Sequence, residues 1–179
     1  EEIPSDFYYS ALDGDFNYNN NEYFGESEDG TDGEEVDLYP EIFIGRAPVD
    51  NAEELSNFVE KTIYAHENKT KSVLFVSEKI YKNNDGASYM EEINKGTNSF
   101  GISTIGYPVS WDKSFLYERN KKWTSSDIVS DLNNGVFMVN HIGISAEVEN
   151  MKLDKESFNN LANKQPFFLY TQGNNSGKF

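Results

Sequence analysis

Two short apolar runs, each followed by a polar loop that contains glycine, do most to constrain what this chain can fold into. The first run is Val-Phe-Met-Val at 136–139, which leads into a loop at 140–145. The second is Phe-Phe-Leu-Tyr-Thr at 167–171, with a loop at 172–177. Runs of this kind are typical of buried parallel strands, and in open α/β sheets functional groups lie just beyond the carboxyl ends of such strands. If these strands are neighbours, we expect their loops to face each other across one crevice.

The remaining periodicity alternates between strand and helix patterns. The clearest helix is 51–67, where apolar side chains recur at i, i+3, i+4, i+7 and i+8 from Leu55. We also expect short strands at 5–10, 39–46 and 72–76, helices at 88–94, 125–134 and 154–163, and an extended segment at 101–109. Strand, helix, strand in this order predicts an α/β fold with a mostly parallel sheet and helices on both faces.

The expected domain organisation is one domain over 1–179. It has no internal repeat and no interdomain linker, and carries a long acidic loop at about 13–37. Since the chain ends a few residues past a predicted strand, we expect an incomplete or excised domain. No stretch is long and apolar enough to span a membrane.

The net charge of −16 is unevenly distributed. Residues 1–60 contain 18 acidic side chains and one basic side chain, Arg46, whereas 61–179 contain 13 acidic and 14 basic ones. The acidic third would repel phosphate backbones, which argues against a nucleic-acid partner. A concentration of carboxylates suits a divalent cation or a basic partner, and it also serves solubility alone.

The acidic loop supplies oxygen ligands of the kind that calcium prefers. Calcium takes six to eight oxygens from carboxylates, amides and carbonyls, and glycine and asparagine allow the turns that bring them together. The candidate ligands are Asp13, Asp15, Asn17, Asn19, Glu26 and Asp37. Their spacing is not that of an EF-hand. The sequence is compatible with two interpretations, an ordered calcium-binding loop and a solvated acidic loop.

Four stretches, taken in order, resemble the gingipain family of cysteine peptidases. They are 5–14, an aromatic entry into the acidic loop; 39–49, Tyr-Pro-Glu-Ile-Phe-Ile-Gly-Arg-Ala-Pro-Val; 132–143, the run before the family's catalytic histidine; and 167–173, the run before its catalytic cysteine. The resemblance implies the three-layer fold that this family shares with caspases and legumains. It also implies a peptide or protein as partner and location outside the cell or on its surface. Further domains, or a companion chain of the same protein, are additional partners that it suggests.

The same resemblance implies that both catalytic side chains are replaced. The family's histidine follows the glycine that corresponds to Gly143, so its position here is Ile144, and the cysteine position is Asn174. A cysteine peptidase needs a thiolate to attack the amide and an imidazole to exchange protons. Gly143 and the backbone N–H of residue 174 would supply an oxyanion hole, which alone leaves only a residual rate. Natural loss and deliberate redesign of the dyad both remain open.

A substitute dyad would have to use His141 with Ser145 or Ser176. A shift of three residues from the family's histidine position points a side chain elsewhere, so we interpret His141 as a hydrogen-bonded structural residue. His66 is expected on the solvated face near the end of its helix, and two isolated histidines do not indicate zinc.

The sequence therefore predicts a gingipain-like domain that binds calcium through its acidic loop and is catalytically inactive. Two alternatives remain. One is an inactivated form of a secreted cysteine endopeptidase that hydrolyses peptide bonds. The other is a calcium-dependent surface or adhesion module, which would bind its partner through residues 13–37.

Overall fold

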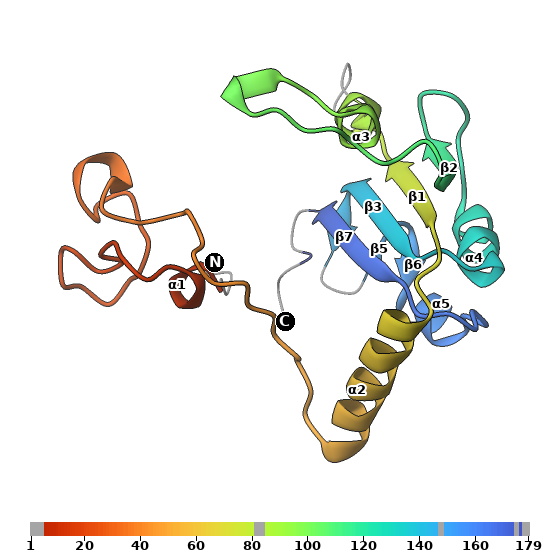
Figure 1. Ribbon diagram of the computed structural model, residues 1–179, viewed down its shortest axis with the longest axis horizontal. Helices are drawn as coiled ribbons and strands as arrows, with labels where there is room; N and C mark the ends of the chain where they lie inside the picture. The colour runs from red at the N-terminus through yellow and green to blue at the C-terminus, as the bar shows by residue number, and fades with distance from the viewer. Residues whose placement is uncertain (1–5, 81–84, 147–148, 174–175, 177–179) are drawn as a thin grey trace. The chain divides into compact units, whose positions relative to one another are not determined.

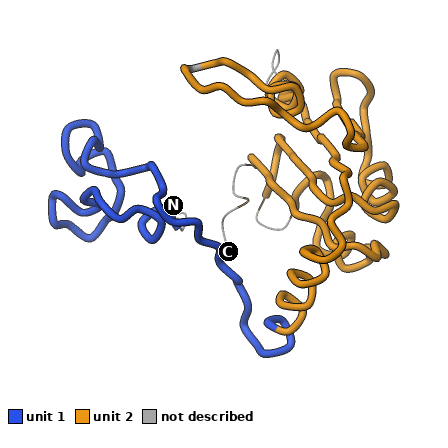
Figure 2. Tube along the Cα trace, viewed as in Figure 1, with its two compact units in different colours: residues 1–55 blue, residues 56–179 orange. Residues whose placement is uncertain are grey.

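The computed structural model describes residues 6–80, 85–146, 149–173 and 176. The chain divides into two compact units, residues 1–55 and residues 56–179, coloured separately in Figure 2. The prediction that the whole chain forms one domain remains a prediction. None of the described helices is long and apolar enough to cross a membrane.

A four-stranded, fully parallel sheet forms the centre of the second unit (Figure 1). Its strands are β1 (Ser72–Ser77), β2 (Asp112–Tyr117), β3 (Met138–Gly143) and β7 (Phe168–Gly173), in the order β2-β1-β3-β7. The two apolar runs thus lie in adjacent strands, as predicted; β3 extends four residues beyond its run and β7 extends two. The sheet confirms the predicted α/β class.

Helices cover both faces of this sheet because alternate side chains of its strands point to opposite sides. On one face Leu74 and Val139 pack with Ile128 and Leu132 of α4 (Ser125–Asn134). On the other face lie α3 (Ala87–Lys95) and a second apolar cluster, made of Val73, Phe75, Ala87, Met90, Tyr117 and Ile142. The predicted helices at 88–94 and 125–134 are therefore confirmed.

A small antiparallel sheet follows β3. It consists of β4 (Ser145–Ala146), β5 (Glu149–Asn150) and β6 (Leu153–Asp154), in that order. The turn between β5 and β6 places Met151 and Lys152 at φ values of 53° and 58°, a conformation that costs non-glycine residues free energy. α5 (Lys155–Asn159) comes next and is shorter than the predicted 154–163.

Two sequence predictions of strands are wrong. The aromatic segment near the start forms a short helix, α1 (Phe7–Ser10), and 39–46 forms no strand. The segment at 39–46 has strand-forming side chains, but no strand of the described chain pairs with it, and a strand requires a partner. Two short 3₁₀ turns, η1 (Thr31–Gly33) and η2 (Ser99–Gly101), complete the described elements.

α2 (Ala52–Glu67) confirms the clearest predicted helix, although none of its residues is buried. Its apolar stripe, including Phe58, Val59 and Ile63, remains between 44% and 53% exposed. His66 lies in its last turn and is exposed, as expected.

Candidate binding crevice at the strand ends

The carboxyl ends of β3 and β7 lie side by side, with Gly143 opposite Gly173 in the register. The loops that follow these strands therefore start side by side, and a crevice between them stays a prediction. Ile144, the position predicted for the family's histidine, comes directly after Gly143 and is 58% exposed. Asn174, the position predicted for the family's cysteine, lies outside the described residues.

A buried hydrogen-bonded chain crosses the sheet just below this crevice. Nε2 of His141 lies 3.3 Å from Oε1 of Glu78, and Nδ1 lies 2.8 Å from Oγ1 of Thr171. His141 is fully buried and Glu78 is 5% exposed. An ionised Glu78 carboxylate can only accept, so it requires Nε2 of His141 as the donor; Nδ1 of the neutral ring then accepts from the Thr171 hydroxyl. His141 is thus a buried, hydrogen-bonded residue, as the sequence analysis predicted.

These hydrogen bonds join three strands of the sheet. Glu78 follows β1, His141 lies in β3, and Thr171 lies in β7. Sequence reasoning missed Glu78 and Thr171. The available signal for Glu78 was its place directly after a buried apolar strand, where a charged side chain needs a partner.

The side chain of Glu78 also lies against the backbone at Gly143 and Ile144. Its Oε2 accepts the N–H of Ile144 at 3.4 Å. A Cβ on Gly143 would come within 2.6 Å of Nε2 of His141 and 2.8 Å of Cδ of Glu78, so only glycine fits. An oxyanion hole needs free N–H donors, and a carboxylate beside the same backbone opposes the negative charge of a tetrahedral intermediate.

The two candidate serines do not pair with His141. Both ring nitrogens of His141 have other partners, Glu78 and Thr171. Ser145 is 3% exposed, and its Oγ has no hydrogen-bond partner within the described chain. Oγ of Ser176 accepts from Nδ2 of Asn150 at 3.3 Å. The described residues therefore form no serine and histidine dyad.

A pocket of about 320 Å³ opens beside the crevice. Its lining combines β4 and β5 with α5 and the segment after β7: Ala146, Glu149, Asn150, Lys155, Phe158, Asn159 and Ser176. Residues that follow both strand ends thus line one pocket. The aromatic ring of Phe158 and the charges of Glu149 and Lys155 give this pocket both apolar and polar walls.

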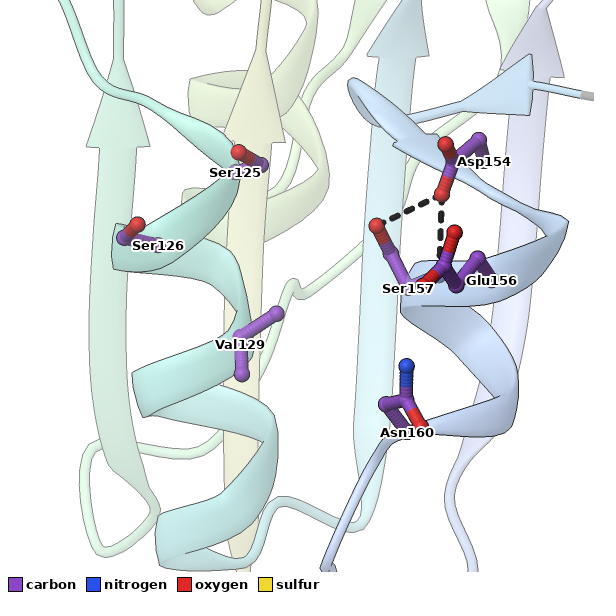
Figure 3. A pocket seen from close by; sticks show the side chains of 7 residues that line it. All are labelled: Ser125, Ser126, Val129, Asp154, Glu156, Ser157 and Asn160. Carbon is purple, nitrogen blue, oxygen red and sulfur yellow. Dashed lines mark hydrogen bonds between the residues drawn. The ribbon is translucent and has the colours of Figure 1, made fainter.

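A second pocket, of about 400 Å³, lies between α4 and α5 (Figure 3). One of its two carboxylates, Asp154, caps α5: it accepts hydrogen bonds from the N–H and the hydroxyl of Ser157 at 2.8 and 2.7 Å. Ser125 and Ser126 line the opposite wall. Because Asp154 is already engaged in a helix cap, this pocket offers no evident reactive group.

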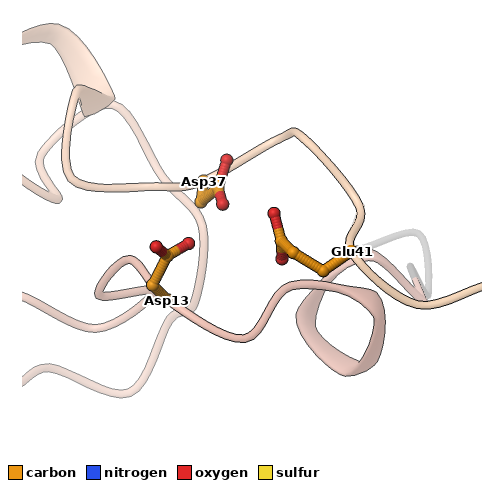
Figure 4. A group of neighbouring side chains, drawn as sticks. All are labelled: Asp13, Asp37 and Glu41. Carbon is orange, nitrogen blue, oxygen red and sulfur yellow. The ribbon is translucent and has the colours of Figure 1, made fainter.

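In the first unit, three carboxylates converge: Asp13, Asp37 and Glu41 (Figure 4). One oxygen from each lies within 4.8 Å of the others. A hydrogen bond to Asp37 and the negative charges of Glu41 and Asp37 raise the pKa of Asp13. Sequence reasoning missed Glu41, although it belongs to the stretch at 39–49 that resembles the family.

The other predicted ligands are engaged elsewhere in the loop. Oδ1 of Asp15 accepts the N–H of Asn17 at 3.0 Å, and Nδ2 of Asn19 donates to Oε1 of Glu26 at 2.9 Å. Buried Asp29 orders the same loop by accepting backbone N–H groups, including those of Gly25 and Glu26 at 3.0 Å. Of the six predicted ligands, the structure brings together Asp13 and Asp37.

The comparisons with known proteins give one match. A search of curated proteins found no significant similarity, and a search of solved structures found none either. The sequence model of Peptidase family C25 matches residues 1–179. The parallel sheet with flanking helices is consistent with the caspase-like fold of the gingipains. This chain therefore belongs to Peptidase family C25, the gingipain family of cysteine peptidases.

Proposed function

We propose that this chain binds a peptide or protein segment at the strand-end crevice and does not cleave it. The observation that carries the proposal is the exposed Ile144 at the position of the family's histidine, beside a pocket and in a chain without cysteine. Family membership supplies the expectation of a peptide ligand. The chemistry of the crevice residues supports binding without hydrolysis.

Peptide hydrolysis by this family depends on two groups that the crevice lacks. A thiolate must attack the carbonyl carbon, and an imidazole must deliver a proton to the leaving amine. The isoleucine side chain cannot exchange protons, and no thiol is available anywhere in the chain. His141 does not compensate, since it is fully buried and both its ring nitrogens have partners.

The pocket beside the crevice supports a binding role. Phe158 offers apolar contact, while Glu149 and Lys155 offer charges of both signs at the rim. Binding sites of this kind combine apolar area with a few polar groups that fix orientation. A peptide side chain in this pocket would lie next to Ser176 and Asn150.

The test of inactivity uses peptides that contain arginine or lysine. We expect no turnover above the blank from the unaltered chain. Ile144→His and Asn174→Cys together should restore cleavage, and neither alone should, because the thiolate and the imidazole act as one unit. Substantial turnover by the unaltered chain would overturn the proposal.

The test of binding uses the same peptides and two substitutions that fill different pockets. Ala146→Trp should occupy the pocket beside the crevice and weaken peptide binding measured by calorimetry. Ser126→Trp, which fills the pocket in Figure 3, should leave it unchanged. Equal loss of binding in both variants would place the peptide elsewhere.

We further propose that Asp13, Asp37 and Glu41 bind calcium. Carboxylate oxygens are hard ligands that suit this ion. The pKa of Asp13 is raised by its hydrogen bond with Asp37 and by the like charges of Glu41 and Asp37, which a cation would neutralise. The exposed position of Asp13 and Glu41 fits the weaker affinities of extracellular calcium modules. This matches the location that we propose for the chain, secreted or at the cell surface, where gingipain-family proteins are typically found.

A further inference from the structure

A pocket of about 360 Å³ lies within the first unit, where the acidic loop begins. The aromatic rings of Tyr8, Phe16 and Phe24 line it together with the carboxylates of Asp13 and Asp15. The function proposed above uses one of these carboxylates, that of Asp13, and gives the rings no role. Aromatic and anionic groups around one pocket are a combination that suits a positively charged organic group.

The three rings are set at right angles to one another. The Tyr8 ring meets the rings of Phe16 and Phe24 edge to face, with centroids 5.6 and 5.9 Å apart and interplanar angles of 88° and 87°. The backbone fixes this arrangement, because the N–H of Gly25 donates to the carbonyl of Phe16 at 2.8 Å. Phe16 is 9% exposed, whereas Tyr8 and Phe24 are 52% and 62% exposed. Two of the rings are therefore accessible to a ligand.

The first unit supplies no cation of its own to this pocket. The pocket has no basic side chain in its described lining. Arg46 is the one lysine or arginine among residues 1–55, and its Nε donates to Oδ1 of Asp6 at 3.1 Å. Oδ1 of Asp15 accepts the N–H of Asn17 at 3.0 Å, which leaves Oδ2 available. A cation that pairs with Asp15 has to come from another molecule.

We propose that this pocket binds the guanidinium group of an arginine side chain from a peptide or protein, at a site separate from the strand-end crevice. A guanidinium is planar and weakly hydrated, so it can lie on an aromatic ring while its N–H groups donate to a carboxylate. A lysine ammonium is more strongly hydrated and suits ring faces less well. Calcium needs a shell of oxygens, which the neighbouring cluster of Asp13, Asp37 and Glu41 is better placed to begin.

The charge of the first unit favours the same ligand. Residues 1–55 contain 17 acidic side chains and one basic side chain. A field of this sign concentrates cations near the loop and repels anionic peptides. Since the attraction acts largely through solvent, the affinity for arginine should fall as salt rises from about 0.05 to about 0.5 M.

The experiment compares N-acetyl-arginine amide with N-acetyl-citrulline amide, which has nearly the same shape but no charge. Both are titrated into the full chain carrying Ala146→Trp, which fills the pocket beside the strand-end crevice, in the presence of a chelator that removes calcium. Two-dimensional NMR of the backbone amides locates the ligand. We expect shifts at residues 14–17 and at Phe24, and an affinity for the citrulline compound about tenfold lower.

Matched substitutions separate the two walls of the pocket. Phe24→Leu should weaken arginine binding about two- to fivefold, because it removes one ring, whereas Tyr18→Leu, a similarly exposed aromatic outside the pocket, should leave binding unchanged. Asp15→Asn should also weaken binding, and Glu22→Gln, which removes an exposed carboxylate elsewhere in the loop, should not. Both substitutions at the pocket alter exposed side chains, so the loop should keep its fold.

Three results would overturn the proposal. They are equal affinity for the arginine and citrulline compounds, amide shifts that avoid the pocket, and equal loss of binding in Phe24→Leu and Tyr18→Leu. Absence of binding by the arginine compound would also overturn it, and would leave the peptide site at the strand ends untouched, because that pocket is filled in this experiment.

Discussion

Nε2 of His141 lies 3.3 Å from Oε1 of Glu78, and both side chains are buried. The pair closes the end of the sheet beneath the position where the family performs its chemistry. A buried imidazole therefore lies directly below the predicted position of the family's histidine. This imidazole serves the structure, because it connects β1 to β7 through Thr171.

Glu78→Ala should lower the free energy of unfolding by about 1–3 kcal/mol, the usual cost of leaving a buried polar group without its partner. The orphaned group is the Nε2–H of His141. Urea denaturation followed by circular dichroism measures the change. Glu92→Ala, which removes an exposed carboxylate from α3, should leave stability nearly unchanged.

The same pair can be tested for coupling. Glu78→Ala combined with His141→Leu should cost less than the two single substitutions added together, since the second change removes the orphaned donor. Additive costs would mean that Glu78 stabilises the fold through something other than His141.

Most of the sheet was predictable because its inner strands are continuous apolar runs. β1 and β3 are buried on both faces, and β7 begins with the apolar residues Phe168, Leu169 and Tyr170. β2 escaped prediction because, as an edge strand, it mixes Asp112 and Lys113 with Phe115 and Leu116. The prediction of a strand at 39–46 was wrong for the opposite reason. Its residues suit a strand, but no strand in the described chain pairs with it.

The candidate site was predictable only where a local motif marked it. Gly143 and Ile144 follow from the run that precedes them. Glu78 and His141 are 63 residues apart, and they meet because β1 and β3 are neighbours. The meeting of Glu41 with Asp13 likewise depends on how the loop closes. Pairings of this kind follow from tertiary structure and are not marked by local spacing.

Calcium at about 1 mM should raise the Tm of the chain by roughly 3 °C if the carboxylate cluster binds it, because an ion that binds only the folded state stabilises it by mass action. Differential scanning calorimetry with and without chelator measures the shift. Asp13→Asn with Glu41→Gln should abolish it, whereas Glu22→Gln, outside the cluster, should not. An equal rise in all three proteins would assign the ion to another site.

The calcium effect should also weaken as pH falls. Neighbouring carboxylates raise the pKa of Asp13 above its ordinary value of 3.8, so a proton competes with the ion before ordinary carboxyls titrate. Without calcium, the stability of the fold depends on pH in the opposite direction. The raised pKa of Asp13 in the folded state favours folding at low pH, and this contribution is lost as pH rises through that pKa. Calcium titrations between about pH 7 and pH 4 measure the competition. An affinity independent of pH over this range would exclude Asp13 as a ligand.

Lys152 should hold the strained turn between β5 and β6 in place. Its Nζ pairs with Glu118, donates to the carbonyl of Trp123 at 3.0 Å and lies 3.6 Å from the centre of the Trp123 ring. Burial opposes ionisation of Glu118, but hydrogen bonds from Lys152 and from the N–H of Lys79 outweigh it and lower the pKa of Glu118. Lys152→Ala should therefore destabilise the fold by loss of the ion pair and of the cation and ring contact.

The pH dependence of stability separates the loss of the ion pair with Glu118 from the loss of the contact with the Trp123 ring. A lowered carboxyl pKa contributes stability above the ordinary value of 4.5 and loses it as pH falls through the folded value. The stability difference between the unaltered chain and Lys152→Ala should thus be largest near neutral pH and shrink below pH 4.5, where the contacts of Lys152 with Trp123 remain. Urea denaturation across this range measures it, and Lys95→Ala, which breaks an ion pair with the partly buried Glu91 on α3, serves for comparison. A difference that stays constant with pH would show that Lys152 acts through its contacts with Trp123 alone and that its pairing with Glu118 contributes no stability.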